Sequence, residues 1–415
     1  MIRDKYLNIN KITTDSDVLK IFDIVRSHGG IVRFVGGAVR DAIVGKKGFD
    51  LDLSTDLSPD ELAEACEDAG VKTIPIGLKY GTLGVIINNT VLEITSLRKD
   101  IKTDGRHAVV EFTDNWEEDA SRRDLTINAV YADEEGNVFD YYNGINDLEK
   151  GIVRFIGNAD QRVKEDYLRI LRFFRFHSLF AKTPIDKYAL KACIDNKNGL
   201  ETISIERIRD ELTKIFLTHN AAEVIGIMLD NGILDNWLSP SNYLSNFDFL
   251  IHLEEGLELS PNPLRRFFVL YFPNKTLAEN LAIRMHLTKR QKETMIKWAE
   301  NKIGLENILE EQLRRKLIFR FGKEFCIDKL IIEAARTQTI PEEISSIISN
   351  INETIVPIFP ISGKDIIKAG KIENSQIGLL LDKLKEDWIA SDFSLSREDL
   401  LQKIQQTMPP KVSLA

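Results

Sequence analysis

Two aspartates, Asp50 and Asp52, stand one residue apart in the apolar run FDLDL (residues 49–53). Side chains alternate between the two faces of a strand, so both carboxylates are expected on one face, with their apolar neighbours in the core. Two like charges this close repel each other unless cations lie between them, and such oxygen ligands suit Mg²⁺. A pair of ions ~3.5–4 Å apart can activate an attacking hydroxyl and stabilise the leaving group of a phosphoryl transfer. A strand edge with two solvated carboxylates fits the pattern equally well.

Glu93 is a third candidate carboxylate. It lies in the run VLEIT (residues 91–95), where alternation again predicts a strand with the acid on its polar face. Glu93 could complete the metal shell or orient it. An ordinary exposed strand glutamate is as compatible with the same residues.

A glycine pair, Gly36 and Gly37, connects a predicted strand to a predicted helix that begins near Ala38. Without side chains the backbone can come close to a ligand, and a helix N-terminus offers free N–H groups and partial positive charge to a phosphate. Arg40 would add a cation one turn into the helix. The pattern predicts a phosphate site, although an ordinary strand-to-helix turn has the same features.

The segment SRRDLTINA (residues 121–129) supplies a second set of candidates. Adjacent cations followed by an acid can bind a triphosphate and a ribose through charge-assisted hydrogen bonds. We assign the nucleotide contact to Arg123, with Asp124 positioning it and Asn128 capping the local backbone. A surface salt bridge is the alternative for each of them.

Four charged residues recur every three positions in KEDYLRILRFFRF (residues 164–176): Asp166, Arg169, Arg172 and Arg175. On one helix this spacing gives a slowly winding polar stripe. Arginines without lysines favour planar, forked hydrogen bonding over a merely solvated face. Cytosine and adenine both present an amino donor beside an unprotonated ring nitrogen, which a carboxylate and a guanidinium complement. We hypothesise that Asp166 and Arg169 accept C and A and reject G and U without a template.

The candidate residues lie in a part of the chain that is predicted to form a sheet and then helices. Residues 31–142 contain short β-rich runs separated by helical stretches such as SPDELAEACEDAG, in which Ser58 and Pro59 form a predicted N-cap and first turn. After residue 156 the strand patterns nearly vanish and helical periodicity dominates. A chain of 415 residues with 43% hydrophobic content predicts about two to four domains.

Composition limits the partners and the location. The formal net charge of −9 does not itself predict nucleic-acid binding, so local positive patches must decide. Cys66, Cys193 and Cys326 are far apart and form no Cys-x-x-Cys pair, which argues against disulfides and zinc and predicts buried thiols. Residues 1–15 lack a signal-peptide pattern and no segment approaches the ~20 apolar residues of a membrane span. We therefore expect a cytoplasmic protein with no membrane partner.

Taken in order, the motifs resemble those of the class II tRNA nucleotidyltransferases, the bacterial and eukaryotic CCA-adding enzymes. The match covers residues 31–176 through GGAVRDAIVG, DLD, LEITSLR, RRDLTINA, DYYNGINDLEKGIVR and EDYLRILRFFRF, and SIERIRDEL is similar to the family's next helical motif. The resemblance implies an α+β chain: an N-terminal polymerase-β-like sheet domain (1–145), a helical neck that reads the base (146–220), and a helical body and tail that bind tRNA (221–415).

The resemblance also implies roles for single residues. Asp50 and Asp52 match metal ligands, and Gly37, Arg40 and Arg123 match triphosphate-binding positions. The base-reading and nucleotide-binding positions of the neck are matched by Asp166, Arg169, Arg172 and Arg175. The implied substrates are CTP and ATP, the implied acceptor is tRNA and the implied metal is Mg²⁺. The oligomeric state stays open.

The run RKDIKTDGRHAVVEFTD (residues 98–114) resembles the family's flexible loop, which is linked to the switch towards ATP. Gly105 with its flanking charges fits a mobile segment, and the loop's presence favours complete CCA addition. Beyond residue 220 the resemblance is weaker. There, tRNA binding is inferred from position and from three basic clusters: Arg265-Arg266, Lys289-Arg290 and Arg314-Arg315-Lys316.

Three alternatives stay open. A bacterial poly(A) polymerase shares the Gly-Gly, Asp-x-Asp and Arg-Arg-Asp elements, but the C-terminal MPPKVSLA is short and nearly neutral where a basic tail is expected. A partial CC-adding or A-adding enzyme is a closer variant. A non-catalytic RNA-binding protein is disfavoured by the intact pair Asp50 and Asp52, since unused paired carboxylates cost solvation and repulsion.

Overall fold

The computed structural model describes residues 2–7, 12, 16–46, 51–88, 90–103, 108–239, 241–369 and 374–407. The chain forms two compact units: Met1–Ser241 with Leu281–Leu287, and Asn242–Asn280 with Thr288–Ala415. The domain boundaries expected near residues 145 and 220 both fall inside the first unit, and they stay predictions.

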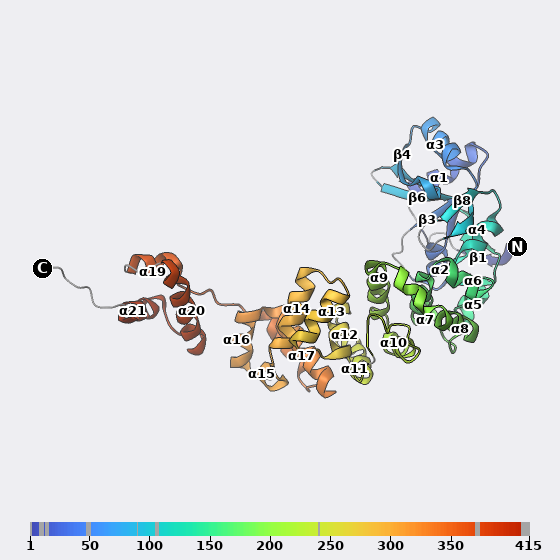
Figure 1. Cartoon of the computed structure of the whole chain (residues 1–415). Helices are drawn as coiled ribbons and strands as arrows, with labels where there is room; N and C mark the ends of the chain where they lie inside the picture. The colour runs from blue at the N-terminus through green and yellow to red at the C-terminus, as the bar shows by residue number, and fades with distance from the viewer. Residues whose placement is uncertain are drawn as a thin grey trace. The chain divides into compact units, whose positions relative to one another are not determined.

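The first unit contains an eight-stranded mixed sheet with the order β1-β10-β9-β2-β3-β6-β5-β4, blue to cyan in Figure 1. Its β3–β6 pair is parallel and its other pairs are antiparallel. The strands are β1 (Ile2–Tyr6), β2 (Val32–Val35), β3 (Asp52–Thr55), β4 (Lys72–Gly77), β5 (Thr82–Ile87), β6 (Thr90–Ser96), β9 (Val130–Ala132) and β10 (Asn137–Asp140). A separate hairpin pairs β7 (Arg98–Thr103) with β8 (Ala108–Phe112).

One face of the sheet is covered by α1 (Ser16–Ser27) and α3 (Pro59–Asp68). The strand residues that point into this layer are at most 4% exposed: Leu83, Val85, Leu92 and Ile94. Helix α3 begins as predicted, because the Ser58 hydroxyl accepts from the Glu61 N–H and the Glu61 carboxylate accepts from the Ser58 N–H. The opposite face is covered at Val35 and Tyr131, which pack with Trp116, but it is exposed at Asp52 and Glu93.

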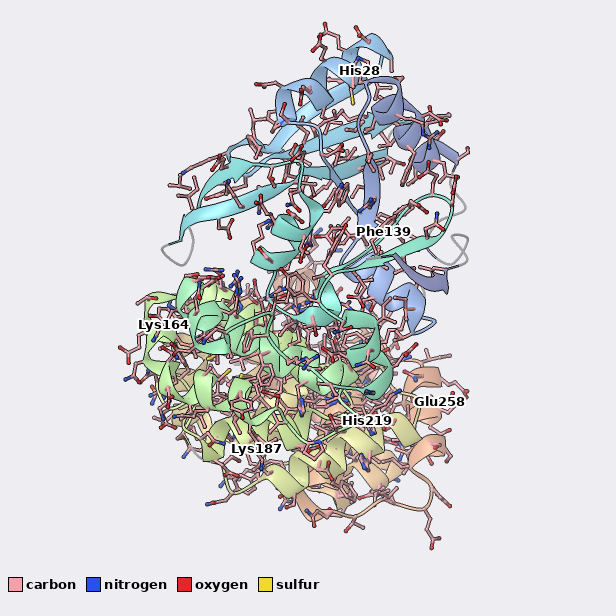
Figure 2. All side chains as sticks on the ribbon, turned by 90° about the vertical axis from the view of Figure 1, so that its right-hand side faces the viewer. His28, Phe139, Lys164, Lys187, His219 and Glu258 are labelled. Carbon is pink, nitrogen blue, oxygen red and sulfur yellow. The ribbon has the colours of Figure 1, made fainter. Side chains whose placement is uncertain are left out.

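Further helices complete the first unit. They are α2 (Gly37–Ile43), α4 (Trp116–Arg122), α5 (Gly144–Lys150), α6 (Ala159–Glu165), α7 (Leu168–Phe180), α8 (Lys187–Asp195), α9 (Ile205–Phe216) and α10 (Ala221–Asp230), with 3-10 turns η2 (Leu78–Tyr80), η3 (Thr126–Asn128) and η4 (Lys197–Thr202). Figure 2 shows helices below the sheet, with Lys164 on α6 and Lys187 on α8. Helix α7 packs against α9 and buries Phe173 and Phe174 completely.

The described residues beyond 241 form helices and no strands. The helices are α11 (Leu244–Gly256), α12 (Pro263–Tyr271), α13 (Lys275–Arg284), α14 (Lys289–Glu300), α15 (Leu305–Leu309), α16 (Glu311–Phe321), α17 (Lys323–Thr337), α18 (Ile344–Glu353), α19 (Gly363–Ala369), α20 (Asn374–Ala390) and α21 (Arg397–Thr407). Helix α17 packs against α11 and α12. None of the helices described is long and apolar enough to cross a membrane.

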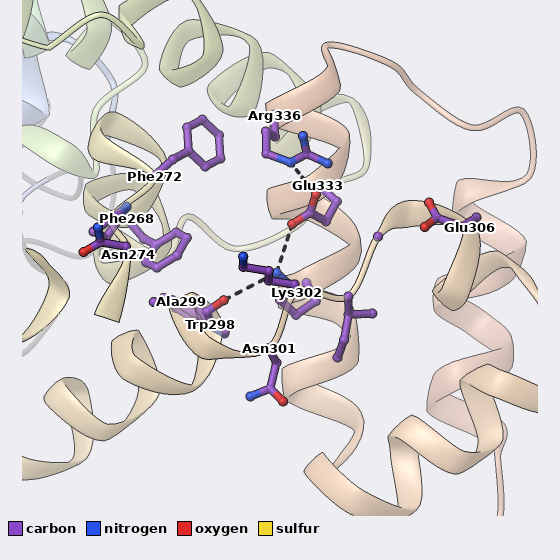
Figure 3. A pocket seen from close by; sticks show the side chains of 14 residues that line it. Phe268, Phe272, Asn274, Trp298, Ala299, Asn301, Lys302, Glu306, Glu333 and Arg336 are labelled. Atoms are coloured by element: carbon purple, nitrogen blue, oxygen red, sulfur yellow. Dashed lines mark hydrogen bonds and ion pairs between the residues drawn. The ribbon is translucent and has the colours of Figure 1, made fainter. Parts of the chain in front are cut away.

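The second unit also contains an open pocket of about 480 Å³. Figure 3 shows Phe268 and Phe272 on one side and α17 residues on the other. Glu333 accepts from Lys329 Nζ at 2.9 Å and from Arg336 Nε at 2.5 Å. These three lining charges are thus satisfied within α17.

The three cysteines are buried free thiols, as predicted. Burial raises the pKa of Cys66 to about 11 and that of Cys326 to about 12. It also raises the pKa of Cys193. None of them is a reactive thiolate at neutral pH.

Candidate active site

Two of the three predicted carboxylates meet on the open face of the sheet. Asp52 opens β3 and lies directly beside Glu93 on the parallel strand β6. Both side chains are exposed, while Leu53 and Ile94 behind them are at most 1% exposed. Asp50 lies outside the described residues. Within the described part of the chain, no three His, Cys, Asp or Glu side chains gather as a metal cluster.

Gly36 adopts a backbone conformation that other residues rarely take, with φ of +63°. A Cβ atom built there would lie 3.7 Å from Arg123 Nη1 and 3.6 Å from the Asn128 carbonyl oxygen. A Cβ on Gly37 would meet only Arg40 Nη2, at 3.8 Å. The glycine pair thus brings bare backbone next to two arginines of the predicted phosphate site.

Asp119 is the residue that positions Arg123, and sequence reasoning did not single it out. Its Oδ2 accepts from Arg123 Nη2 at 3.0 Å and from the Tyr131 hydroxyl at 2.8 Å. Burial opposes charge on this carboxylate, but the neighbouring Arg123 and Arg122 outweigh it and hold the pKa of Asp119 below its ordinary value. The available signal was spacing, because Asp119 precedes Arg123 by four residues at the end of α4.

Asp124 has a different partner from the one predicted. Its Oδ2 accepts from Arg172 Nε at 2.6 Å and its Oδ1 accepts from Asn128 Nδ2 at 3.1 Å. Asn128 Oδ1 in turn accepts from Arg40 Nη1 at 2.6 Å. Asn128 therefore links the side chains of Asp124 and Arg40. The bond to the local backbone that was expected from Asn128 is made by Asp124, whose Oδ1 accepts from the Leu125 N–H.

This chain of hydrogen bonds joins the sheet domain to α7. Burial opposes charge on Asp124, but Arg172 outweighs it and keeps the pKa of Asp124 below its ordinary value. The guanidinium carbons of Arg40, Arg172 and Arg175 also lie 5.0, 5.5 and 4.5 Å from the centre of the Phe176 ring. Arginines from two predicted motifs thus gather around one buried aromatic ring.

The predicted stripe from Asp166 to Arg175 is not one continuous helix. Helix α6 ends at Glu165 and α7 begins at Leu168, with Asp166 extended between them. Asp166 Oδ1 accepts from the Leu168 N–H at 3.0 Å, and a short acidic side chain that binds a nearby backbone N–H in this way competes with a continuous helix. The prediction of a single helix was wrong at this residue, whereas Arg169, Arg172 and Arg175 do share α7.

Asp166 and Arg169 are bound to other partners. Asp166 Oδ2 accepts from Arg207 Nη2 on α9 at 3.2 Å, and Arg169 Nη1 donates to Glu165 Oε2 at 2.6 Å. Arg175 Nη1 donates to Glu211 Oε1 at 3.0 Å. Sequence reasoning missed Arg207, although the motif that contains it had been noticed.

In the second unit the basic pair Arg265-Arg266 points inward, and so does Arg314 of another cluster. Arg265 and Arg266 are at most 4% exposed and bind Glu254 and Asp328. Arg314 is 7% exposed and donates to backbone carbonyls. The expectation that these arginines contact tRNA is corrected, because their donors are already used. Other residues of these clusters reach solvent: Lys289, Arg290 and Arg315.

The described strands of the predicted flexible loop form the β7–β8 hairpin, and they pair with each other and not with the eight-stranded sheet. Gly105, which lies between the two strands in the sequence, is outside the described residues. The interpretation as an ordinary hairpin therefore describes the strands correctly, and the mobility of the tip stays a prediction.

Comparison with known proteins identifies the family of this chain. A model described as "Poly A polymerase head domain" matches residues 32–154, and "Probable RNA and SrmB- binding site of polymerase A" matches residues 184–241. The mouse CCA tRNA nucleotidyltransferase 1, mitochondrial, is 35% identical over 385 residues, which cover 91% of this chain and 87% of the mouse protein. The chain belongs to the family of CCA tRNA nucleotidyltransferases. The CCA-adding enzyme of Ligilactobacillus salivarius is 27% identical over 95% of this chain and 97% of its own.

Solved structures of this family share the fold. The CCA-adding enzyme of Bacillus stearothermophilus, solved with CTP, has a TM-score of 0.76 at 24% identity and covers 94% of this chain and 97% of its own. The Thermotoga maritima enzyme, solved with tRNA, has a TM-score of 0.65 at 18% identity and covers 98% of this chain and 99% of its own. The predicted α+β fold and the membership in the nucleotidyltransferase family are therefore confirmed.

Proposed function

We propose that this chain adds C, C and A to the 3′ end of tRNA from CTP and ATP and releases pyrophosphate. Its relatives from mouse and Ligilactobacillus salivarius are named for CCA addition. The observation that carries the proposal is the placement of Asp52 and Glu93 side by side on the strands next to the Gly36–Arg123 contact. One face thus holds acids for a metal and cations for a triphosphate.

The carboxylates fit a divalent metal, and we propose Mg²⁺. Asp52 and Glu93 supply hard oxygen donors on neighbouring strands, with both side chains exposed on the same face. Asp50 is the expected further ligand. When bound, the metal supplies activation of the attacking hydroxyl and charge neutralisation on the phosphates.

The arginines bind and orient the nucleotide. Asp119 and Tyr131 hold Arg123 Nε and Nη2, which leaves Nη1 directed at the bare backbone of Gly36. A triphosphate seated on that backbone would accept hydrogen bonds from Arg123, with Arg40, which already donates to Asp41 and Asn128, as a second nearby cation. The Asn128 link then ties the position of the triphosphate to the position of Arg172 on α7.

In this proposal, Asp166 and Arg169 select the base of the incoming nucleotide. Arg207 holds Asp166, and Glu165 holds Arg169, so each group has a fixed place from which to meet the Watson–Crick edge of C or A. Asp166→Ala and Arg169→Ala should each weaken discrimination against UTP and GTP. An unchanged preference for C and A in both variants, measured by single-nucleotide incorporation, would refute the assignment.

The product length tests the function. Purified protein is given tRNA that lacks its last three nucleotides, with CTP alone, ATP alone, or both. We expect two added nucleotides with CTP, and three with both. A long product with ATP alone would indicate a poly(A) polymerase, and no product under any condition would indicate a non-catalytic RNA-binding protein.

The cytoplasmic location expected from the sequence stays a prediction. The mouse and human relatives are named as mitochondrial enzymes. Fluorescence microscopy of the tagged full chain in its own cells would settle the location.

A further inference from the structure

The face of the sheet that is turned away from α1 and α3 carries more than the two carboxylates. Cross-strand pairing places Asp52, Glu93, Gly84 and Ile74 in one row across β3, β6, β5 and β4. Directly paired residues share a face of a sheet. The row therefore runs from the two acids, on β3 and β6, to an apolar residue on the edge strand β4.

An apolar patch begins where the acids end. We use this name for four residues: Ile74, Ile76, Ile86 and Val91. Ile76 and Val91 are each 46% exposed. A Cβ on Gly84 would lie 2.6 Å from Ile76 Cδ1 and 2.8 Å from Ile74 Cγ1, so these two side chains lie over the Gly84 backbone beside Glu93. Contiguous exposed apolar groups next to a reactive site mark a binding surface.

A cation borders the apolar patch. Lys72 pairs with Ile86, which pairs with Val91, so the three side chains form the next row on the same face. The Lys72 side chain is exposed, and its ammonium group forms no hydrogen bond or ion pair with the residues that the structure describes. Its charge is available to a phosphate.

The geometry of phosphoryl transfer indicates which substrate lies over the apolar patch. Gly36 follows β2, and Arg123 Nη2 lies 3.4 Å from Ser54 Oγ on β3, so the triphosphate candidates lie on the β2 side of the acids. In a phosphoryl transfer the attacking and leaving oxygens lie on opposite sides of the phosphorus. A triphosphate on the β2 side therefore requires the attacking hydroxyl to arrive from the side of β6 and β5.

We infer that the unpaired 3′ nucleotides of the acceptor RNA lie on the apolar patch, with Lys72 at their phosphates. This inference rests on the proposed function. Unpaired nucleotides bind where an apolar surface takes their bases and a cation takes their backbone. The patch offers no base-specific donors of its own, so it would accept each successive 3′ end as the chain grows.

The test is RNA binding without nucleotide or catalysis. Two labelled tRNAs are titrated by fluorescence anisotropy: one that ends in two unpaired C, and one with a blunt acceptor stem. In the variant Ile76→Ser/Val91→Ser we expect the Kd of the first to rise about tenfold, with that of the blunt RNA unchanged. The Lys72→Gln variant should reduce the salt dependence of binding by about one counterion for the first RNA only.

Two controls keep the result interpretable. Ile31→Ser removes an isoleucine that is also 46% exposed, but that precedes β2 and donates its N–H to Asp56, and it should leave both affinities unchanged. Val91→Thr keeps the β-branched shape if the double variant proves unstable, and it should raise the Kd of the first RNA less than the double variant does.

The outcomes separate the two proposals. If unmodified protein extends tRNA but the patch variants bind both RNAs normally, the inference fails and the proposed function stands. If the unmodified protein does not extend tRNA, but the patch variants lose its difference in affinity for the two RNAs, only the proposed function is refuted. Equal binding of both RNAs by the unmodified protein would overturn the inference.

Discussion

Gly36 shows how one residue without a side chain controls a site. Its φ of +63° is unfavourable for any other residue, and a Cβ would lie 3.7 Å from Arg123 Nη1. Gly36→Ala should raise the KM for CTP and ATP about tenfold and cost about 1–2 kcal/mol of stability. Gly45→Ala is the matched control, because Gly45 has a φ of +77° with nothing within 4 Å. It should lose similar stability and keep its KM.

Asp119 makes the site sensitive to acid. Its pKa is lowered in the folded state, so it contributes stability above the ordinary pKa of 3.8, and this contribution is lost as the pH falls below that value. At pH 7, Asp119→Asn should cost about 3–5 kcal/mol, because Arg122 and Arg123 lose a buried partner. Denaturant unfolding should show this difference shrinking between pH 4 and pH 2. A constant difference would contradict the ion-pair account, and Glu117→Gln, exposed on the same helix, is the control.

At the scale of elements, local patterns predicted most strands and helices of the first unit. The Ser58 cap, the strand before Gly36 and the alternation at Glu93 are all local, so the sequence alone sufficed for them. The break at Asp166 was missed, because the three-residue spacing is satisfied whether or not the helix is continuous. The contact from Asp166 to Arg207 joins residues 41 positions apart and leaves no periodic trace.

The role of the β7–β8 hairpin can be tested by shortening it. Its two described strands pair with no strand of the eight-stranded sheet, so shortening the hairpin should leave that sheet intact. Replacement of residues 102–109 by two glycines should give tRNA with two added C and no terminal A, because the family resemblance links this segment to the switch towards ATP. Product sequencing measures the outcome. Complete CCA addition by the shortened chain would refute the role.

At the scale of the whole molecule, charge is the least predictable property from sequence. The basic pair Arg265-Arg266 is buried against Glu254 and Asp328, whereas Lys289-Arg290 is exposed. Two adjacent basic residues look the same in the sequence whether they are buried or exposed. Only acids from distant parts of the chain decide which pair is buried in ion pairs. With a net charge of −9, tRNA binding must therefore depend on where exposed cations gather on the surface.

Exposed and buried cations should respond differently to neutralisation. Lys289→Gln/Arg290→Gln should weaken tRNA binding severalfold and lower its salt dependence by about two counterions, with stability unchanged. Arg265→Gln should instead cost about 3–5 kcal/mol of stability, since it removes the arginine partner of the buried Asp328 and one of the two arginines that bind Glu254. Filter binding across salt concentrations and denaturant unfolding measure the two effects. Unchanged tRNA affinity in the first variant would exclude this face from the interface.

The central claim is that the whole chain adds CCA through the carboxylates of the open sheet face. The most direct measurement compares the unmodified protein with Asp52→Asn on tRNA that lacks its last three nucleotides, with CTP, ATP and Mg²⁺ present. We expect the unmodified protein to add three nucleotides and the variant to be slower by about a thousandfold or more while it stays folded. Extension by Asp52→Asn at the unmodified rate would contradict the account.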